Sequence, residues 1–378
     1  MTQFTQRTVS PFRYDIVGSF LRPQELKDAR AKFAKGKISQ ADLTKVEDKC
    51  IVDLIHKEEV VGLKAVTDGE FRRSWWHLDF FWGLQGTKHV QLKHGYLFHD
   101  EETRNDSVQL TGKVSGENHP FVNYFKFVRD HISDGTQVKQ TIPAPAQFLE
   151  EFLRPENQAN VQQFYPNQTD LDHDVARAYH QVIEDLYAAG CRTLQLDDCT
   201  WGISVNNFAN LKKKDPNADT SQLEALQRRF LKVNNEAIAD LPDDLVVNTH
   251  VCRGNYHSTW AAAGGYGPVA DTLLAHENVN AFYLEYDSDR AGGFEPLAKV
   301  PDDKYVVVGL VTSKSGELED KQIIIDRLKE AAKYHPLDKL CLSPQCGFAS
   351  TEEGNILIEE QQWNKLKFIK EIAEEVWG

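Results

Sequence analysis

The sequence has no run of about 18 apolar residues, the length that a transmembrane helix needs. Residues 1–14 are polar and lack the apolar core of a secretory signal peptide. Positive charge is in deficit, because 43 Lys and Arg stand against 57 Asp and Glu and leave a net charge of −14. These absences argue against a nucleic acid or a membrane as partner, and we expect a cytoplasmic protein that binds small molecules. Nothing in the sequence fixes the oligomeric state.

The sequence also has no Cys-x-x-Cys pair. Its six cysteines are Cys50, Cys191, Cys199, Cys252, Cys341 and Cys346. In a large cytosolic chain such cysteines are more often free, catalytic or metal-bound than paired in disulfides. Any metal site must therefore be assembled from residues that lie far apart in the chain.

No linker, low-complexity stretch or short internal repeat divides the 378 residues, a length that suits one large barrel or two medium domains. Eight apolar segments are predicted as strands, at 13–20, 65–71, 137–145, 192–198, 245–252, 280–285, 305–311 and 339–344. The spacing of apolar residues predicts helices at 23–35, 40–62, 169–189, 221–240, 319–334 and 353–376.

This alternation of strands and helices predicts an α/β fold of the (β/α)8 TIM-barrel class. The competing doubly wound sheet would usually carry a glycine-rich phosphate turn after its first strand, and Gly18-Ser19-Phe20-Leu21 is not such a turn. Alternating apolar residues at 88–115 predict a β-hairpin inserted after the second strand. We therefore predict a single catalytic domain, 1–378, with an inserted segment at 83–118.

Polar or titratable residues follow most of the predicted strands, at the end where barrel enzymes build their sites. They are Ser19, Asp68, Glu70, Asp197, Asp198, His250, Cys252, Glu285, Ser313, Lys314 and Cys346. His250 and Cys252 share one face of their strand, because residues two apart point to the same side. One His-x-Cys pair is weak evidence, since a buried cysteine is usually a small apolar residue. The convergence of the whole set on one barrel mouth is the stronger indication.

Four of these side chains form a set that suits zinc. They are His250, Cys252, Glu285 and Cys346. Two thiolates and one carboxylate around a dication leave a net charge of about −1, so the metal is a milder Lewis acid than in a site of neutral ligands. A substrate thiol bound there would lose its proton and keep an electron-rich sulfur. The set favours activation of a thiol for alkyl transfer over hydrolysis.

Six motifs, in the same order, resemble the catalytic C-terminal domain of cobalamin-independent methionine synthase. They are Gly18-Ser19-Phe20, Asp68-Gly69-Glu70, Leu194-Gln195-Leu196-Asp197, His250-Val251-Cys252, Glu285 and Pro344-Gln345-Cys346-Gly347. The resemblance covers nearly the whole chain and is least clear at 80–115. It implies a zinc-dependent S-methyltransferase of methionine biosynthesis, which moves a methyl group from 5-methyltetrahydrofolate to the thiol of homocysteine.

The resemblance also implies a role for each matching residue. His250, Cys252, Glu285 and Cys346 would hold Zn2+, while Ser19, Glu70 and Asp197 would hold the amino acid. The two carboxylates would face its ammonium group, which is charge-complementary to them. The family has a histidine after the seventh strand that is thought to assist proton transfer to the leaving folate, and here Lys314 stands in its place. Lys314 is therefore our candidate proton donor, with Asp197 as a second catalytic candidate.

The methyl donor stays open at this point. The full-length family has a second, N-terminal barrel that helps to bind the polyglutamate tail of the folate, and this chain has room for one barrel. The alternatives are another methyl donor such as a methylcorrinoid, another small thiol, a zinc hydrolase, and a non-catalytic metal or folate binder.

Two polar or aromatic clusters have a structural and a functional interpretation. Trp75, Trp76 and Trp82 could form an aromatic wall for a pterin, although packing in the core is the more common use of such residues. The asparagines and lysines at 206–214 indicate a solvated loop more than a phosphate site.

Overall fold

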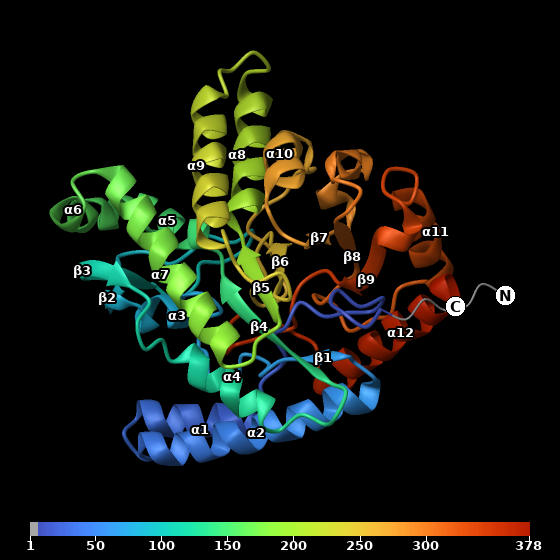
Figure 1. The fold of residues 1–378 in the computed structure, drawn as a ribbon, viewed down its shortest axis with the longest axis horizontal. Coiled ribbons are helices and arrows are strands. Elements are labelled where there is room, and N and C mark those ends of the chain that lie inside the picture. Colours follow the sequence, from blue (N-terminus) through green and yellow to red (C-terminus); the bar gives the residue numbers. More distant parts are fainter. Residues whose placement is uncertain (1–6) are drawn as a thin grey trace.

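The computed structural model describes residues 7–378, so residues 1–6 of the polar N-terminal stretch lie outside the described residues. Seven parallel strands form one curled sheet in the order β1-β4-β5-β6-β7-β8-β9 (Figure 1). Their bounds are β1 (Ala65–Val66), β4 (Gln137–Pro143), β5 (Thr193–Asp198), β6 (Val246–Val251), β7 (Ala281–Glu285), β8 (Tyr305–Val311) and β9 (Leu340–Pro344). Every described residue of β5, β6, β7 and β9 is buried, as expected for parallel strands covered on both faces.

The predicted first strand, 13–20, is an extended segment that joins the two ends of this sheet. Tyr14 forms a parallel bridge with Leu342 of β9. On the other side, the Phe20 N–H donates to the carbonyl of Gly69 at 3.1 Å, just beyond β1. The segment is not a regular strand, because the Asp15 carboxylate accepts hydrogen bonds from the backbone N–H of Ile16 and from that of Phe12 just before the segment. The predicted TIM-barrel architecture is thus confirmed, with the irregular segment 13–20 in the position of the first strand.

The second predicted strand, 65–71, ends earlier than expected, at Val66. The Glu58 carboxylate accepts the Thr67 N–H at 3.1 Å, and the Thr67 hydroxyl donates to the carbonyl of Gly18 at 2.6 Å. These bonds take the place of strand ladder bonds. The chain then turns through Asp68-Gly69-Glu70 toward the barrel mouth.

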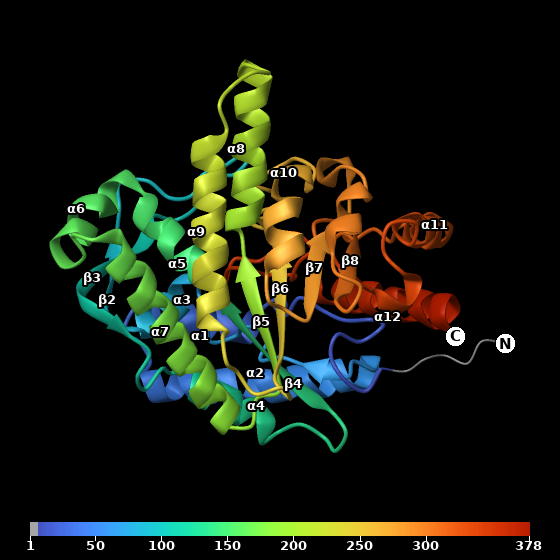
Figure 2. The same ribbon diagram turned by 45° about the horizontal axis from the view of Figure 1, so that its top comes forward.

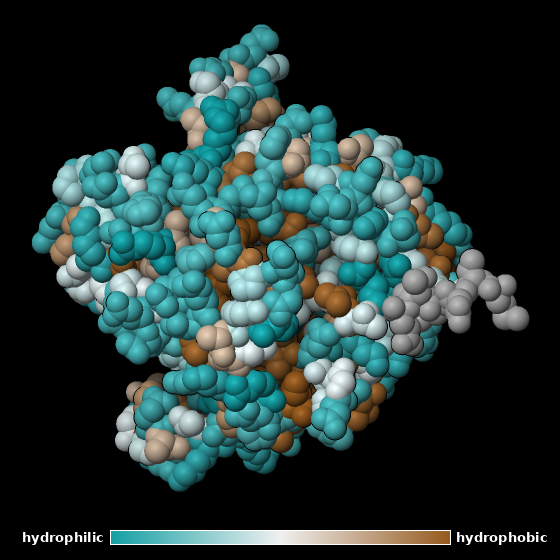
Figure 3. All heavy atoms as spheres, viewed as in Figure 1, coloured by the Kyte–Doolittle hydropathy of each residue, from teal (hydrophilic) through white to brown (hydrophobic). Residues whose placement is uncertain are grey.

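Helices surround the sheet on its outer side (Figures 1 and 2). They are α1 (Gln24–Ala34), α2 (Gln40–Val61), α3 (Leu78–Gly83), α4 (Phe121–Arg129), α5 (Pro145–Leu153), α6 (Pro155–Phe164), α7 (Gln168–Ala188), α8 (Thr200–Lys214), α9 (Ser221–Ala237), α10 (Gly267–Val269), α11 (Lys321–Ala331) and α12 (Glu359–Trp377). The face seen in Figure 3 is mostly hydrophilic, with hydrophobic residues showing in its middle. No helix of the described residues is both long and apolar enough to cross a membrane.

Residues 206–214, predicted as a loop, lie on α8 instead. Trp201 and Val205 are four residues apart and both buried, so this helix has one apolar face that the polar Asn and Lys residues obscure in the sequence. Lysines 212–214 occupy its last turn, where positive charge is favourable. In both ribbon views α8 and α9 stand side by side and project from the barrel.

Two antiparallel strands, β2 (Gln85–Gln91) and β3 (Asp106–Ser115), lie outside the parallel sheet and between β1 and β4 in the chain. Val108, Leu110 and Val114 of β3 are buried and anchor the pair against the barrel. The connecting residues 92–105 return to the barrel mouth, where the His99 N–H donates to the carbonyl of Trp260 at 2.8 Å. This connection becomes part of the site described next.

Candidate active site

Four side chains from separate strand ends meet at the barrel mouth. His250 lies in β6, Cys252 follows that strand, Glu285 ends β7, and Cys346 follows β9. One ligand atom from each lies within 4.8 Å of the others, and each residue is at most 7% exposed. The carboxyl ends of adjacent parallel strands lie on the same rim, which brings these residues together although they are 96 positions apart at the extremes (346 − 250).

Two buried side-chain atoms of this quartet have no hydrogen-bond partner among the described residues, which suits the binding of a cation. His250 contacts the carbonyl of Tyr283 through Nδ1 at 3.2 Å, so its Nε2 faces the quartet, and that buried atom has no hydrogen-bond partner among the described residues. Glu285 Oε2 is buried and unpaired in the same sense. Each such atom costs about 1–3 kcal/mol of free energy of folding if nothing satisfies it.

The spacing of the two sulfur atoms also fits a metal. Cys252 Sγ and Cys346 Sγ lie 3.7 Å apart. Two thiolates at about 2.3 Å from a tetrahedral zinc ion would be about 3.8 Å apart, whereas a disulfide needs about 2.05 Å. The donor set and its spacing therefore fit zinc, and no disulfide joins the two cysteines.

Without a cation the two thiols hold their protons. A hydrogen bond with Cys199 and burial raise the pKa of Cys252 well above its usual range. A hydrogen bond with Cys252 and burial raise the pKa of Cys346 in the same way. Backbone groups already orient the quartet, because the Gly254 N–H donates to Cys252 Sγ at 3.3 Å and the Arg253 N–H donates to Glu285 Oε1 at 3.0 Å.

A small cavity beside the quartet brings three more of the sequence-predicted residues to it. Ser19, Glu70 and Asp197 line this cavity together with His250, Cys252 and Cys346. We call it the acceptor cavity. Its remaining lining residues are Val17, Trp76, Gly347 and Ser350.

The Glu70 carboxylate is held in the acceptor cavity by a strained turn. Gly69 and Glu70 both have positive φ, 61° and 62°, and a Cβ at position 69 would collide with Leu54. Such a conformation at a glutamate costs about 1–3 kcal/mol, and the Asp68 carboxylate offsets part of this cost by accepting the Glu70 N–H at 2.8 Å. Arg73 pairs with Glu70 Oε1 at 3.2 Å, while Oε2 has no partner among the described residues.

Burial outweighs the nearby positive charges in its effect on the pKa of the two acids of the acceptor cavity. Burial, and then the charge of Asp197, raise the pKa of Glu70 to about 7, against the opposing effect of Arg73. Burial raises the pKa of Asp197 to about 7 as well, although a hydrogen bond from Gln195 opposes the shift. A cationic group placed between them would restore both to their ionised form.

Ser19 is fixed by the loop that carries Cys346. Its hydroxyl accepts the Ala349 N–H at 3.3 Å, and its carbonyl accepts the Phe348 N–H at 2.9 Å. A Cβ at position 347 would collide with that hydroxyl, which explains the glycine in Pro344-Gln345-Cys346-Gly347. The loop after β9 thus connects Cys346 of the quartet to Ser19 of the acceptor cavity.

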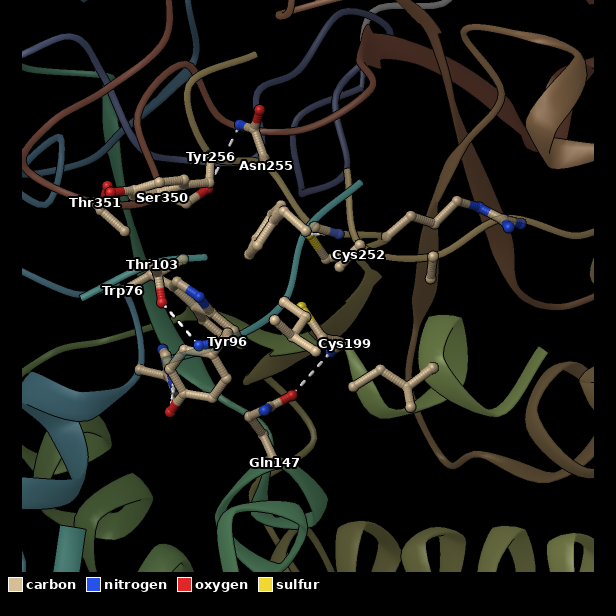
Figure 4. A pocket seen from close by; sticks show the side chains of 18 of the residues that line it. Trp76, Tyr96, Thr103, Gln147, Cys199, Cys252, Asn255, Tyr256, Ser350 and Thr351 are labelled. Atoms are coloured by element: carbon tan, nitrogen blue, oxygen red, sulfur yellow. Dashed lines mark hydrogen bonds between the residues drawn. The ribbon is translucent and has the colours of Figure 1, made fainter. Parts of the chain in front are cut away.

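A larger cavity of about 300 Å³ opens on the other side of Cys252 (Figure 4). Figure 4 shows Trp76 and Tyr96 on one side of it and Cys199 and Cys252 on the other. We call it the donor cavity. Trp76 and Cys252 line both cavities, so the two spaces are adjacent.

Most of the donor-cavity wall was missing from the sequence prediction. Tyr96, Phe98 and Thr103 come from the connection between β2 and β3, and Asn255 and Tyr256 come from the loop after β6. None of them ends a strand, so the rule that identified the quartet could not find them. The aromatic content of 92–105 is the one signal that the sequence offered.

Of the three tryptophans, two line the donor cavity as an aromatic wall, and one is used in packing. Trp75 and Trp76 line the donor cavity, although Trp75 is also 2% exposed and packed in the core. Trp82 does not line it, and its indole N–H donates to the carbonyl of Ser107 at 3.1 Å under the inserted strands.

Two other candidates lie away from the cavities. Lys314 lines neither cavity, and its buried amine donates to Asn255 Oδ1 at 3.2 Å. Asp198 faces the helices, where it accepts hydrogen bonds from Thr200 and Asn234. Asp198 is therefore a structural neighbour of the site, while Lys314 reaches the donor cavity only through the Asn255 side chain.

Comparisons with known proteins agree with this geometry. The family model described as "Cobalamin-independent synthase, Catalytic domain" matches residues 13–374. The uncharacterized protein YxjH of Bacillus subtilis (strain 168) is 44% identical over 369 residues, which are 97% of this chain and 95% of YxjH. A methionine synthase of Sulfolobus acidocaldarius is 23% identical over 332 residues, 88% of this chain and 84% of that protein.

A solved structure extends the likeness to three dimensions. The putative vitamin-B12 independent methionine synthase of Listeria monocytogenes superposes with a TM-score of 0.76 at 37% identity, over 98% of this chain and 99% of that chain. The resemblance seen in the motifs is thereby confirmed. The chain belongs to the cobalamin-independent methionine synthase family, and it is a methyltransferase of that family's homocysteine-methylating type.

Proposed function

We propose that this chain is a zinc-dependent S-methyltransferase that transfers a methyl group from 5-methyltetrahydrofolate to the thiol of homocysteine and yields methionine. The observation that supports this best is the contact between the quartet and the acceptor cavity. Cys252, Cys346 and His250 belong to the candidate metal site and also line the cavity that holds Glu70 and Asp197. A molecule with a thiol at one end and an ammonium group at the other matches both.

The metal end of the cavity would be formed by His250, Cys252, Glu285 and Cys346. Zinc held by these ligands would bind the substrate sulfur and lower the pKa of the thiol, so that the thiol is ionised at neutral pH. The anionic ligands keep that sulfur nucleophilic, as argued from their charges above. Burial of all four residues keeps bulk water away from the sulfur.

The amino-acid end would be formed by Glu70, Asp197 and Ser19. The two carboxylates accept hydrogen bonds from the ammonium group, and Glu70 Oε2 is free to do so among the described residues. The Ser19 hydroxyl, which already accepts one backbone N–H, can donate its own proton to the substrate carboxylate. This end therefore selects an α-amino acid over a simple thiol.

The donor cavity would hold the methyl donor with its methyl group toward the sulfur. Its aromatic walls suit a planar heterocycle such as a pterin. We infer that the chain acts as one catalytic unit, with 83–118 as its insertion, because the connection at 92–105 supplies part of this wall. Lys314 is retained as the proposed proton donor to the leaving group, acting beside Asn255.

Two basic side chains that adjoin the lining residues Thr103 and Tyr256 of the donor cavity bear on the binding of a long polyglutamate tail. Arg104 pairs with Glu353 at 2.6 Å, and His257 pairs with Glu101 at 3.1 Å. These two basic groups are thus already matched by carboxylates. A methylcorrinoid, or another small thiol at the acceptor cavity, is the alternative reading of the same site.

The proposal is tested by product formation with defined donors. Zinc-loaded protein is supplied with homocysteine and with methyltetrahydrofolate that carries either one or three glutamates, and methionine is quantified. We expect methionine from both folates at rates within about threefold of each other, because Arg104 and His257 are already paired with carboxylates and would give a glutamate tail little extra binding. Methionine from methylcobalamin alone would transfer the assignment to a corrinoid donor, and no methionine from any donor would refute the proposed reaction.

The acceptor cavity predicts a pH dependence. Burial raises the pKa of Glu70 to about 7 in the substrate-free protein, and only its ionised form attracts an ammonium group. We expect kcat/KM for homocysteine to fall as the pH drops below 7, by roughly tenfold per pH unit for each acid that must lose its proton. In Glu70→Gln this contribution should disappear from the profile between pH 5.5 and 8.5. A wild-type profile that is flat across that range would contradict the role of Glu70.

A further inference from the structure

A layer of buried polar side chains lies inside the barrel, next to the acceptor cavity. Lys139 of β4 is 2% exposed, and its amine has four oxygen neighbours. They are Asp15 Oδ1 at 2.8 Å, the Ile16 carbonyl at 2.6 Å, Tyr283 OH at 3.1 Å and Gln195 Oε1 at 3.3 Å. The Tyr283 hydroxyl donates in turn to Asp15 Oδ2 at 2.8 Å, so the charge of Lys139 is matched by one acid.

Gln195 connects this layer to the acceptor cavity. Its Oε1 faces Lys139, while its Nε2 donates to Asp197 Oδ1 at 2.8 Å and to the Val17 carbonyl at 2.7 Å. Both Asp197 and Val17 line the acceptor cavity. Gln195 and Asp197 lie two residues apart on β5 and therefore point to the same side of the sheet.

The ammonium group of Lys139 decides which way the Gln195 amide points. An ammonium group has donors and no acceptor, so only the carbonyl end of the amide can face it. The NH2 end is then forced toward Asp197, which when ionised can only accept. The Val17 carbonyl, which can only accept, favours the same orientation, and a reversed amide would present its oxygen to both Asp197 and Val17.

We propose that Gln195 is a positioning residue, held in one amide orientation by Lys139, that aims the Asp197 carboxylate at the ammonium group of the substrate. The proposal rests on the proposed function, because it takes Asp197 as an ammonium-binding group. Gln195 satisfies one oxygen of Asp197 and leaves the other for the substrate. Gln195 itself lines neither cavity, so its effect on the ammonium group passes through Asp197.

The test is a comparison of two ligands that differ only in the amine. Binding of homocysteine and of 4-sulfanylbutanoate, which lacks the amine, is measured by calorimetry on zinc-loaded wild type, Gln195→Met and Gln195→Asn. Methionine has the length of glutamine without its hydrogen bonds, and asparagine keeps the amide but is too short to span Lys139 and Asp197. We expect wild type to favour homocysteine, and both variants to lose at least about tenfold of that preference.

A matched control separates positioning from general damage. Gln227 is a buried glutamine of α9 whose amide donates to the Ser204 hydroxyl at 2.9 Å, away from both cavities. Gln227→Met should keep the wild-type preference, and all variants should keep the same zinc content. If Gln195→Met does not fold, the asparagine variant still gives the result.

The outcomes distinguish this proposal from the proposed function. Wild type that discriminates, together with Gln195 variants that discriminate equally well, would overturn the positioning role and leave the proposed function intact. Wild type that binds the two ligands equally would show that Glu70 and Asp197 do not bind the amine, which refutes both. A loss of discrimination in Gln195 variants but not in Gln227→Met supports the positioning role.

Discussion

Cys346→Ser is expected to lose its bound zinc and its methyl-transfer activity together. Serine keeps the shape of the side chain, but a hydroxyl is a far poorer zinc ligand than a thiolate. Replacement of groups that merely support metal ligands costs about 10- to 100-fold in affinity or activity, so loss of a ligand should exceed about 100-fold. Zinc per chain is measured by elemental analysis, and methionine is measured in the same preparation.

Cys341→Ser is the matched control for this experiment. Cys341 is a buried cysteine of β9, five residues before Cys346, and its Sγ lies 4.0 Å from the Pro11 carbonyl, outside the quartet. The substitution leaves the four residues of the quartet unchanged, so the variant should retain zinc and activity. Equal zinc content in the two variants would mean that Cys346 is not a ligand.

Glu70→Gln and Asp197→Asn are expected to raise the KM for homocysteine by at least about 30-fold. Each change removes one charge from the buried cavity that we propose binds the ammonium group, and loss of one partner of such a pair costs about 2–5 kcal/mol of binding free energy. Steady-state kinetics with homocysteine as the varied substrate measure the effect. The maximal rate should change less than KM, because neither carboxylate contacts the quartet sulfurs.

Two comparisons keep this prediction specific. Glu277 is a fully buried acid that accepts a hydrogen bond from Asn234, and its pKa is raised to about 8 by burial, so Glu277→Gln should leave the KM unchanged. A thiol with a sulfonate in place of the amino acid should be affected far less than homocysteine. Equal losses for the two thiols would mean that Glu70 and Asp197 do not bind the amine.

The quartet could be predicted because the rule behind it is geometric. Parallel strands place their carboxyl ends on one rim, so residues such as His250 and Cys346 are brought together once the strands are located. The burial of whole strands made them visible as apolar runs. Even so, the strand predicted at 65–71 is only the two residues of β1. The hydrogen bonds of the Glu58 and Thr67 side chains replace the backbone bonds that a longer strand would form.

The donor cavity could not be predicted in the same way. Tyr96 and Tyr256 lie on loops, whose paths depend on tertiary contacts such as the bond between His99 and the Trp260 carbonyl. The polar layer around Lys139 was also hidden, since a lysine within a strand reads as an exposed position. Its role emerges only when Asp15, from the extended segment that joins the two ends of the sheet, is placed beside it.

Zinc K-edge X-ray absorption of the zinc-loaded protein, with and without homocysteine, tests the proposed site most directly. Two sulfur neighbours, from Cys252 and Cys346, are predicted for the protein alone, and three are predicted after homocysteine is added. Asp197→Asn should need more homocysteine to reach the same spectrum. A sulfur count that stays at two with saturating homocysteine, or a protein that takes up no zinc under reducing conditions, would contradict thiol activation at this quartet.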